Sequence, residues 1–253
     1  MRAKKRAADE LRPVKLKLDC LDFAFASTFI EMGKTKIIAA ATVEEKVPLF
    51  IKNTGSGWIT AEYALLPCST EKRTSRERMP GRISGRTQEI QRLIGRALRA
   101  VTDLSSLGER TIIIDCDVIQ ADGGTRAASI TASCVALALA LKKMLDEGLL
   151  DHMPLRHLVS AVSVGIVEGV ALLDLDYSED SQAQVDMNVV ATDIGQIVEI
   201  QASAEKYPFS HKEFNSLLEM ANKGINELIH LQKETLKKKS LLFIAYGRKE
   251  EKK

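Results

Sequence analysis

One segment, CDVIQADGGTRAASITASCVALALALKKMLDEG, constrains the fold more than any other part of the chain. The run of β-branched residues RTIIIDCDVIQ overlaps its start and predicts a strand. This run stops before Gly123-Gly124, and an Ala- and Leu-rich stretch from Thr125 to about Asp146 predicts a long helix. The chain must therefore pass from a strand into the start of a long helix within a few residues.

Strands are predicted throughout both halves of the chain. Strand-like runs lie on both sides of Gly33, after Trp58, and on both sides of Gly169 and Gly195. Each half runs through strands and then into a helix, which indicates a weak structural duplication although no sequence repeat is visible.

Two further helices are predicted from apolar residues at helical spacing. The first runs from Thr87, and the second starts at Ser210, where Glu213 forms a capping box. No linker marks a boundary between the halves. We therefore expect one domain over residues 1–240 and a basic C-terminal tail over 241–253.

The composition is that of an ordinary globular protein. The chain has 253 residues, 45% hydrophobic and 28% charged, with a net charge of only +2, so overall basicity does not predict nucleic-acid binding. The cysteines form no CxxC pair, which favours reduced thiols: Cys20, Cys68, Cys116 and Cys134. We expect no apolar run near the roughly 20 residues that span a bilayer. The basic N-terminus MRAKKRAADELRP has no apolar stretch behind it, so we expect a cytoplasmic protein without membrane contact.

The Gly-Gly-Thr-Arg sequence at the start of the long helix is a candidate phosphate site. Thr125 is expected to cap the helix, whose first backbone N–H groups lack internal partners and carry partial positive charge. Gly124 would let an anion approach the backbone, and Arg126 adds a planar fork that fits phosphate oxygens. A cation in the first helical turn opposes the helix dipole unless an anion is bound. These residues alone leave open whether the segment binds phosphate or is simply a capped turn.

A polar loop rich in arginine precedes the predicted helix at Thr87. Such a loop suits a polyanion, although it is also typical of a solvated charged surface; its arginines are Arg73, Arg76, Arg78, Arg82 and Arg86. Arg86 differs from the others because it lies beside a helix start. Arginines at two helix starts suggest one shared anion.

A cluster of acidic residues is the third candidate: Asp174, Asp176, Glu179, Asp180 and Asp186. Asp174 and Asp176 alternate with apolar residues, as on a strand with one wet face, and Asp180 falls in the turn after it. Asp186 lies between apolar neighbours on the next strand. Paired carboxylates on adjacent strands can hold Mg²⁺, and the alternative is surface acid on a hairpin. Phosphate site, basic loop and carboxylate pair together indicate phosphoryl or nucleotidyl transfer on a nucleic acid.

Several long motifs, in order, resemble the ribonuclease PH family. They are DELRPV from Asp9, GWITAEY from Gly57, GRTQEIQRLIGRALRA from Gly85, DCDVIQADGGTRAASIT from Asp115, AVSVGIV from Ala161 and EDSQAQVDMNVV from Glu179. The resemblance implies an α+β fold of duplicated β-α-β units with helices packed on mixed sheets. It also implies a homohexameric ring, a trimer of dimers.

The resemblance further implies a reaction and its residues. Inorganic phosphate would attack the last internucleotide phosphorus of an RNA, chiefly a tRNA precursor, and release a nucleoside diphosphate in a reversible step. Arg86, Gly124, Thr125 and Arg126 match the phosphate-binding residues. Asp180 and Asp186 match the catalytic aspartates that would bind Mg²⁺ or Mn²⁺, and Arg86 and Arg126 are also taken as catalytic. Arg73 and Arg76 are expected to contact RNA.

The chain departs from the family pattern at a few positions. Cys68 replaces a frequent arginine, and Ala202 and Lys206 stand where glycines are common. Two alternatives remain: a non-catalytic RNA-binding subunit of the same ring, and a small-molecule kinase. The first would usually lack the arginines or aspartates, and the second should carry a longer glycine-rich loop.

Overall fold

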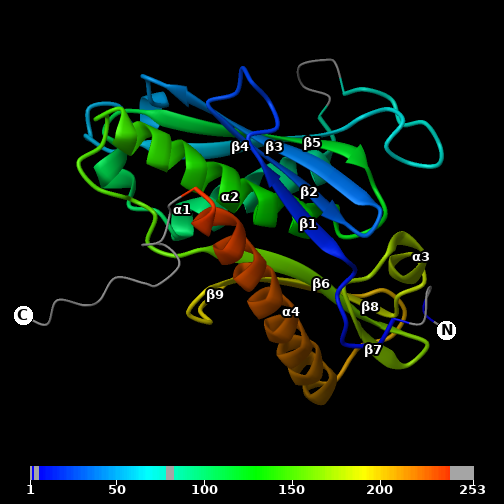
Figure 1. Cartoon of the computed structure of the whole chain (residues 1–253). Helices are drawn as coiled ribbons and strands as arrows, with labels where there is room; N and C mark the ends of the chain where they lie inside the picture. Colours follow the sequence, from blue (N-terminus) through cyan, green and yellow to red (C-terminus); the bar gives the residue numbers. More distant parts are fainter. Residues whose placement is uncertain (1, 3–5, 78–82, 240–253) are drawn as a thin grey trace, which may run out of the picture.

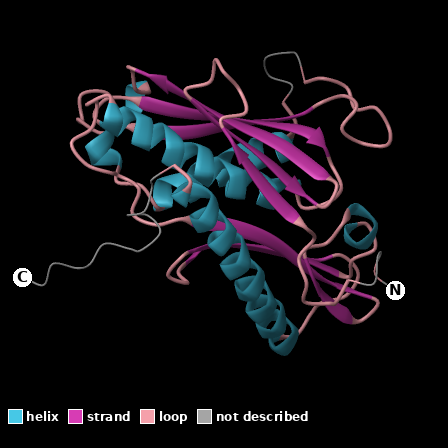
Figure 2. Cartoon of the chain, viewed as in Figure 1, coloured by secondary structure: helices cyan, strands magenta, loops and turns pink. Residues whose placement is uncertain are grey.

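The structure, a computed structural model, describes residues 2, 6–77 and 83–239 as two β-sheets with helices between and beside them (Figures 1 and 2). The first sheet has the order β1-β2-β3-β5-β4, formed by β1 (Val14–Leu18), β2 (Ala26–Met32), β3 (Thr35–Glu44), β4 (Trp58–Leu65) and β5 (Thr111–Gln120). The second has the order β7-β6-β8-β9, formed by β6 (Val159–Val167), β7 (Val170–Leu173), β8 (Val185–Thr192) and β9 (Ile197–Ala204). The helices are α1 (Gly85–Ala100), α2 (Thr125–Asp146), α3 (Tyr177–Asp180) and α4 (His211–Lys237), with 3₁₀ turns at Leu49–Ile51 and Leu104–Leu107.

The first sheet is mixed and contains a β-α-β unit. Strands β4 and β5 pair in parallel and α1 connects them, while all other neighbours in this sheet are antiparallel. The hairpin of β2 and β3 turns at Gly33, whose φ of 60° lies in the left-handed region that glycine adopts readily. The predicted mixed sheet with packed helices is therefore confirmed for this half.

The second sheet differs from that expectation because all its strands are antiparallel. The helix between its strands is the four-residue α3, which follows β7 and precedes β8. The two halves thus share strands followed by a helix, but the parallel β-α-β unit belongs to the first. The α+β class is confirmed.

Helix α2 forms the centre of the molecule. It packs against β2 and β3 of the first sheet and β6 of the second, and Figure 1 shows it between the sheets. One continuous apolar core includes residues from both sheets and from α1, α2 and α4. By length and composition α2 is a candidate membrane span, which corrects the expectation that no such run exists, but 83% of its apolar window is buried inside the protein. The apolar surface of α2 is therefore covered mainly by the two sheets.

Helices α1 and α4 begin close to the predicted residues. Helix α1 begins at Gly85, two residues before the expected Thr87, because the Ser84 side chain accepts a hydrogen bond from the Thr87 backbone and caps the helix. Helix α4 begins after Ser210 with the predicted Glu213 capping box. The predicted basic tail at 241–253 lies outside the described residues.

Candidate active site

The Gly-Gly-Thr-Arg sequence forms the entry to α2. Gly124, not the predicted Thr125, is the N-cap, with a left-handed φ of 64° and no capping side chain. Thr125 is the first helical residue, and its hydroxyl oxygen accepts a hydrogen bond of 2.9 Å from the buried Tyr63 hydroxyl on β4. Gly123 also has a positive φ, 73°. Two successive left-handed residues turn the backbone sharply into the helix, whose first N–H groups have no intrahelical partner.

The two predicted phosphate arginines occupy the first turns of their helices. Arg126 is the second residue of α2, and its Nη1 donates to Gln201 Oε1 at 2.8 Å and lies 3.6 Å from Glu89 Oε1. Arg86 is the exposed second residue of α1. Neither helix has an acidic residue in its first turn, so at both starts the positive end of the dipole is next to an arginine.

The two predicted catalytic aspartates lie in the second sheet region. Asp180 is the last residue of α3, not part of an open turn, and Asp186 lies on β8. Both are half-buried. The Asn188 side chain, two residues along β8 and on the same face, donates to Asp186 at 3.4 Å.

Electrostatic effects join these aspartates to the arginines. Burial, and then the charge of Asp180, raise the pKa of Asp186 to about 6. Burial also raises the pKa of Asp180, while Arg86 and Arg126 oppose the rise at both carboxyls. The structure therefore brings all four side chains into one region, although they come from different elements.

The carboxylate pair has the chemistry of a magnesium site. Among the described residues, no group of three or more His, Cys, Asp or Glu side chains converges as a metal site. Mg²⁺ is commonly bound through one or two carboxylates, with water and substrate phosphates as its other ligands. The mutual repulsion of Asp180 and Asp186 would be relieved by a divalent cation, so the residues present fit this ion.

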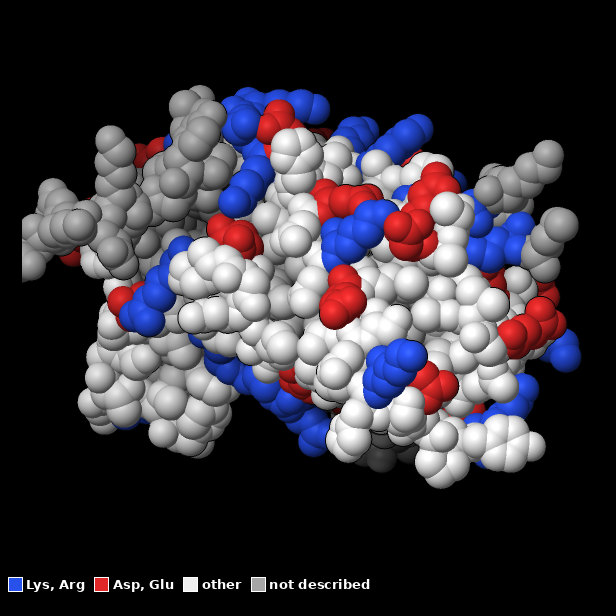
Figure 3. All heavy atoms as spheres, turned by 90° about the horizontal axis from the view of Figure 1, so that it is seen from below, with Lys and Arg blue, Asp and Glu red and all other residues white. Residues whose placement is uncertain are grey.

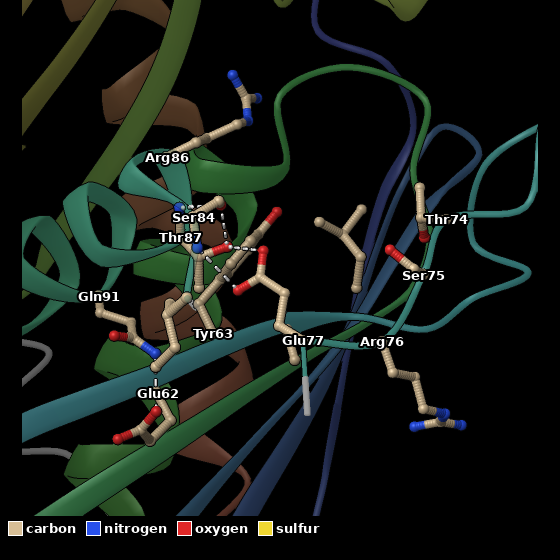
Figure 4. Close-up of a pocket in the computed structure, with 13 residues that line it drawn as sticks. Glu62, Tyr63, Thr74, Ser75, Arg76, Glu77, Ser84, Arg86, Thr87 and Gln91 are labelled. Carbon is tan, nitrogen blue, oxygen red and sulfur yellow. Dashed lines mark hydrogen bonds between the residues drawn. The ribbon is translucent and has the colours of Figure 1, made fainter. Parts of the chain in front are cut away.

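A hollow of about 710 Å³ extends from Arg86 between β4, the start of α1 and the arginine-rich loop (Figure 4). Glu77 turns toward the helix start, where its carboxylate accepts hydrogen bonds from the Ser84 backbone and the Thr87 hydroxyl. The Arg76 side chain points in a different direction from Arg86. Arg76 therefore borders the hollow without joining the Arg86 and Arg126 site.

The other predicted RNA-binding residue, Arg73, lies with Arg76 beside a second, smaller depression. Both arginines are exposed. Arg78 and Arg82 lie outside the described residues. The exposed Cys68, one of the departures from the family pattern, lines the same depression as Arg73.

The models of two domains of one known family together match most of the chain. The 3′ exoribonuclease family, domain 1, matches residues 10–143, and the 3′ exoribonuclease family, domain 2, matches residues 157–224. The chain belongs to the 3′ exoribonuclease family. The first matched region contains every strand of the first sheet, and the second contains every strand of the second sheet.

Curated members of the 3′ exoribonuclease family are similar over nearly the whole chain. Ribonuclease PH of Moorella thermoacetica is 56% identical over 236 residues, which cover 93% of this chain and 94% of that protein. Ribonuclease PH of Syntrophomonas wolfei is 55% identical over 235 residues, 93% of this chain and 98% of that protein. The predicted resemblance to ribonuclease PH is confirmed.

Solved structures show the same fold at lower identity. Rice Rrp46 has a TM-score of 0.74 at 22% identity, covering 93% of this chain and 100% of that chain. A chain of the Archaeoglobus fulgidus exosome, solved with RNA bound to the active site, has a TM-score of 0.75 at 22% identity, covering 88% and 89%. The exoribonuclease fold is thus retained across these proteins.

The sequence did not predict the environment of Asp174. We expected it on the wet face of a strand, but it follows β7, is fully buried, has a φ of 54° and binds Arg12. No role was predicted for Arg12, which entered only as part of the DELRPV motif. The hydrogen bonds from Tyr63 to Thr125 and from Arg126 to Gln201 were also missed, because contacts between distant elements leave no local sequence pattern.

The distribution of charge limits where an RNA could be attracted. On the face in Figure 3, acidic and basic side chains lie interspersed among uncharged ones. With a net charge of only +2, attraction of RNA must come from local groups of arginine, such as those of the 66–77 loop and the two helix starts.

Proposed function

We propose that this chain is a phosphorolytic 3′-to-5′ exoribonuclease that trims RNA, chiefly tRNA precursors, with inorganic phosphate as the attacking group. The observation that carries the proposal is the position of Arg86 and Arg126, both close enough to act on the half-buried Asp180 and Asp186. The relatives named ribonuclease PH support the same reaction class.

In this proposal the attacking phosphate binds at the start of α2. Arg126 and Arg86 offset the repulsion between the phosphate dianion and the RNA phosphate, and the Gly124 and Thr125 amides orient its oxygens. Gln201 holds the Arg126 guanidinium from one side, leaving the rest of its planar fork to bind the anion. Positioning two anions for attack supplies much of the rate enhancement in such transfers.

Asp180 and Asp186 are proposed to hold Mg²⁺ or Mn²⁺, which would stabilise charge on the scissile phosphate. A phosphate oxygen forms a bond to the terminal internucleotide phosphorus, and the bond from that phosphorus to the 3′ oxygen breaks. The 3′ oxygen takes the proton released by the attacking phosphate. The products are a nucleoside 5′-diphosphate and an RNA one nucleotide shorter, and the same site can run the step in reverse.

The proposal includes a homohexamer built as a trimer of dimers, in the cytoplasm. The family resemblance supports a ring, and exposed apolar side chains such as Phe23, Leu49 and Phe50 offer surface for association. Light scattering after size exclusion measures the mass of the particle. A monomer at micromolar concentration would contradict the assembly without affecting the proposed chemistry.

The reaction is tested with an RNA carrying a short 3′ extension, incubated with Mg²⁺ in the presence and absence of phosphate. Nucleoside diphosphates should form only with phosphate, and Asp186→Asn should abolish them. Absence of products from the unaltered protein would overturn the proposal in favour of a non-catalytic RNA-binding subunit. Nucleoside monophosphates would indicate that water, not phosphate, is the nucleophile.

A further inference from the structure

A buried ion pair between Arg12 and Asp174 lies against residues 122–125, the segment that enters α2 and is called the phosphate loop below. Arg12 is 6% exposed and Asp174 is 0% exposed. Arg12 Nη2 donates to Asp174 Oδ1 at 2.6 Å, while Arg12 Nε and its backbone N–H donate to Asp174 Oδ2 at 2.9 and 2.8 Å. Figure 1 shows how the N-terminal segment reaches this place, passing β7 and α3 before it enters β1.

The same guanidinium binds the backbone of the phosphate loop. Arg12 Nη1 donates to the Asp122 carbonyl, and Nη2 donates to the Gly123 carbonyl at 3.4 Å. The Thr35 hydroxyl donates to that second carbonyl at 2.7 Å. In a trans peptide the carbonyl and the next N–H point in opposite directions. Because Arg12 and Thr35 hold the Gly123 carbonyl, the N–H of Gly124 is directed away from them.

Asp174 connects this contact to the helix that carries Asp180. Arg6 donates to the Asp174 carbonyl at 2.9 Å and to Glu179 Oε2 at 3.0 Å. Glu179 in turn caps α3 by accepting from the Asp176 backbone at 3.1 Å, and Asp180 is the next residue. A continuous set of hydrogen bonds therefore links the phosphate loop to Glu179 of α3, the residue before Asp180.

We propose that Arg12 and Asp174 are positioning residues that set the distance and orientation between the phosphate-binding amides of α2 and the aspartate-bearing helix α3. The inference rests on the proposed function of these two elements. Arg12 touches neither reactant in this scheme. It acts by fixing two loops that belong to different halves of the chain.

A role in stability alone explains the arrangement less well. A buried ion pair often contributes no more to stability than an apolar pair of similar volume, because both charges lose their hydration. Here a single guanidinium, that of Arg12, donates both to the Asp174 carboxylate and to the two loop carbonyls of Asp122 and Gly123. Gly124 also leaves room for it, since a Cβ at that residue would lie 3.0 Å from Arg12 Nη2.

The test compares the double variant Arg12→Gln/Asp174→Asn with Leu228→Ala, which truncates a buried apolar side chain of α4 and removes none of the hydrogen bonds of the pair. The double variant removes both charges of the pair together, while Arg6, which also lies 3.3 Å from the Asp174 carboxylate, keeps Glu179 as its partner at 3.0 Å. Asparagine tolerates the left-handed backbone at 174. Arg12→Lys provides a second variant that keeps the charge but loses the fork. Phosphate KM, kcat, RNA affinity without phosphate, and the rise in Tm produced by phosphate are measured well below every melting temperature.

We expect phosphate KM to rise about tenfold or more in the double variant and several-fold in Arg12→Lys, because small displacements of reacting groups carry large rate penalties. The phosphate-induced rise in Tm should shrink in parallel, while RNA affinity stays within about twofold. Leu228→Ala should keep the phosphate KM of the unaltered protein. If both Arg12 variants match Leu228→Ala, or lose only kcat, the inference is overturned.

Arg126→Ala separates this failure from a failure of the proposed site. If Arg126→Ala raises phosphate KM while the Arg12 variants do not, the site stands and only the positioning role is wrong. If Arg126→Ala leaves phosphate KM unchanged, the phosphate site itself is wrong and the positioning role falls with it.

Discussion

The buried Tyr63 hydroxyl donates a hydrogen bond of 2.9 Å to the hydroxyl of Thr125, joining β4 to the first residue of α2. Strand β4 pairs in parallel with β5, which leads directly into the phosphate loop. The loop is thus supported from the strand before it and from the strand beside it. Burial raises the pKa of the Tyr63 phenol, so it remains a neutral donor across the ordinary pH range.

Replacing Tyr63 by Phe should weaken this support while leaving the core packing intact. We expect a loss of about 1 kcal/mol of unfolding free energy, because one buried hydroxyl loses its donor. Phosphate KM should rise only a few-fold, since Thr125 keeps its helical position. Chemical denaturation and steady-state phosphorolysis measure the two effects. Tyr207→Phe, at a residue 72% exposed, is the matched control and should change neither.

Replacing Arg126 by Ala should raise phosphate KM by about tenfold or more, because a charge-assisted hydrogen bond to an anion contributes roughly 1.5–3 kcal/mol. RNA affinity measured without phosphate should change little. Arg156→Ala removes an exposed arginine that pairs with Asp103 at 2.9 Å, away from the site, and serves as control. Normal phosphorolysis by Arg126→Ala at low phosphate would contradict the assigned role.

Local pattern was enough to predict most elements of the fold and to group candidate residues into three clusters, while the resemblance to the family assigned roles to particular residues within them. Around Gly123 the strand, the turn and the bounds of α2 were all predicted correctly. This was possible because a run of β-branched residues favours a strand and an Ala-rich run favours a helix. The cap was misassigned, because the left-handed Gly124 replaces a side-chain cap by backbone geometry. The burial of Arg12 and Asp174 was not predictable, since their pairing joins residues 162 positions apart.

The raised pKa of Asp186 predicts an unusual dependence of stability on pH. The folded pKa of about 6 lies above the ordinary 3.8, so between these values the folded state holds a proton that the unfolded state has lost. Without metal, this carboxyl therefore leaves stability unaffected below that window, where both states are protonated, and lowers it increasingly as pH rises toward 6 and above. Asp186→Asn should raise Tm in chelator at about pH 7.5 and change it little below about pH 4.

The same two proteins should also differ in how Mg²⁺ changes their Tm. Added ion should raise the Tm of the unaltered protein above pH 6 by binding the ionised pair, and should have little effect on Asp186→Asn. Scanning fluorimetry over a pH series with chelator or Mg²⁺ measures both. An equal Tm difference between the two proteins at every pH would mean that the carboxyl at 186 is not perturbed.

Replacing Arg73 and Arg76 by Ala should weaken RNA binding without altering phosphate KM. Both are exposed and border the loop depression, and the Arg76 side chain points in a different direction from Arg86, so we expect them to contact RNA phosphates and not the anion at α2. The slope of log affinity against log salt should fall by about one for each RNA phosphate that is no longer neutralised. Fluorescence anisotropy over a salt series measures the slope. A phosphate KM that rises with these changes would place the loop in the phosphate site instead.

Gly123 should be the least replaceable glycine of the site. A Cβ there would lie 2.5 Å from the Leu175 carbonyl oxygen and 2.8 Å from the Tyr177 nitrogen, both fixed backbone atoms. Gly123→Ala must therefore push the phosphate loop away from the chain that leads into α3. We expect a marked fall in Tm and a rise in phosphate KM, measured in the same preparation.

Gly55→Ala separates this collision from backbone strain. Gly55 has a φ of 72°, almost the same as the 73° of Gly123, but a Cβ at Gly55 would meet no atom within 4 Å. Both substitutions impose the left-handed penalty of about 1–2 kcal/mol, and only Gly123→Ala adds contact with Leu175 and Tyr177. Because the collision acts between the phosphate loop and the approach to α3, only Gly123→Ala should alter phosphate KM. Equal effects of both variants on Tm and KM would mean that the loop and α3 can separate without consequence for the reaction.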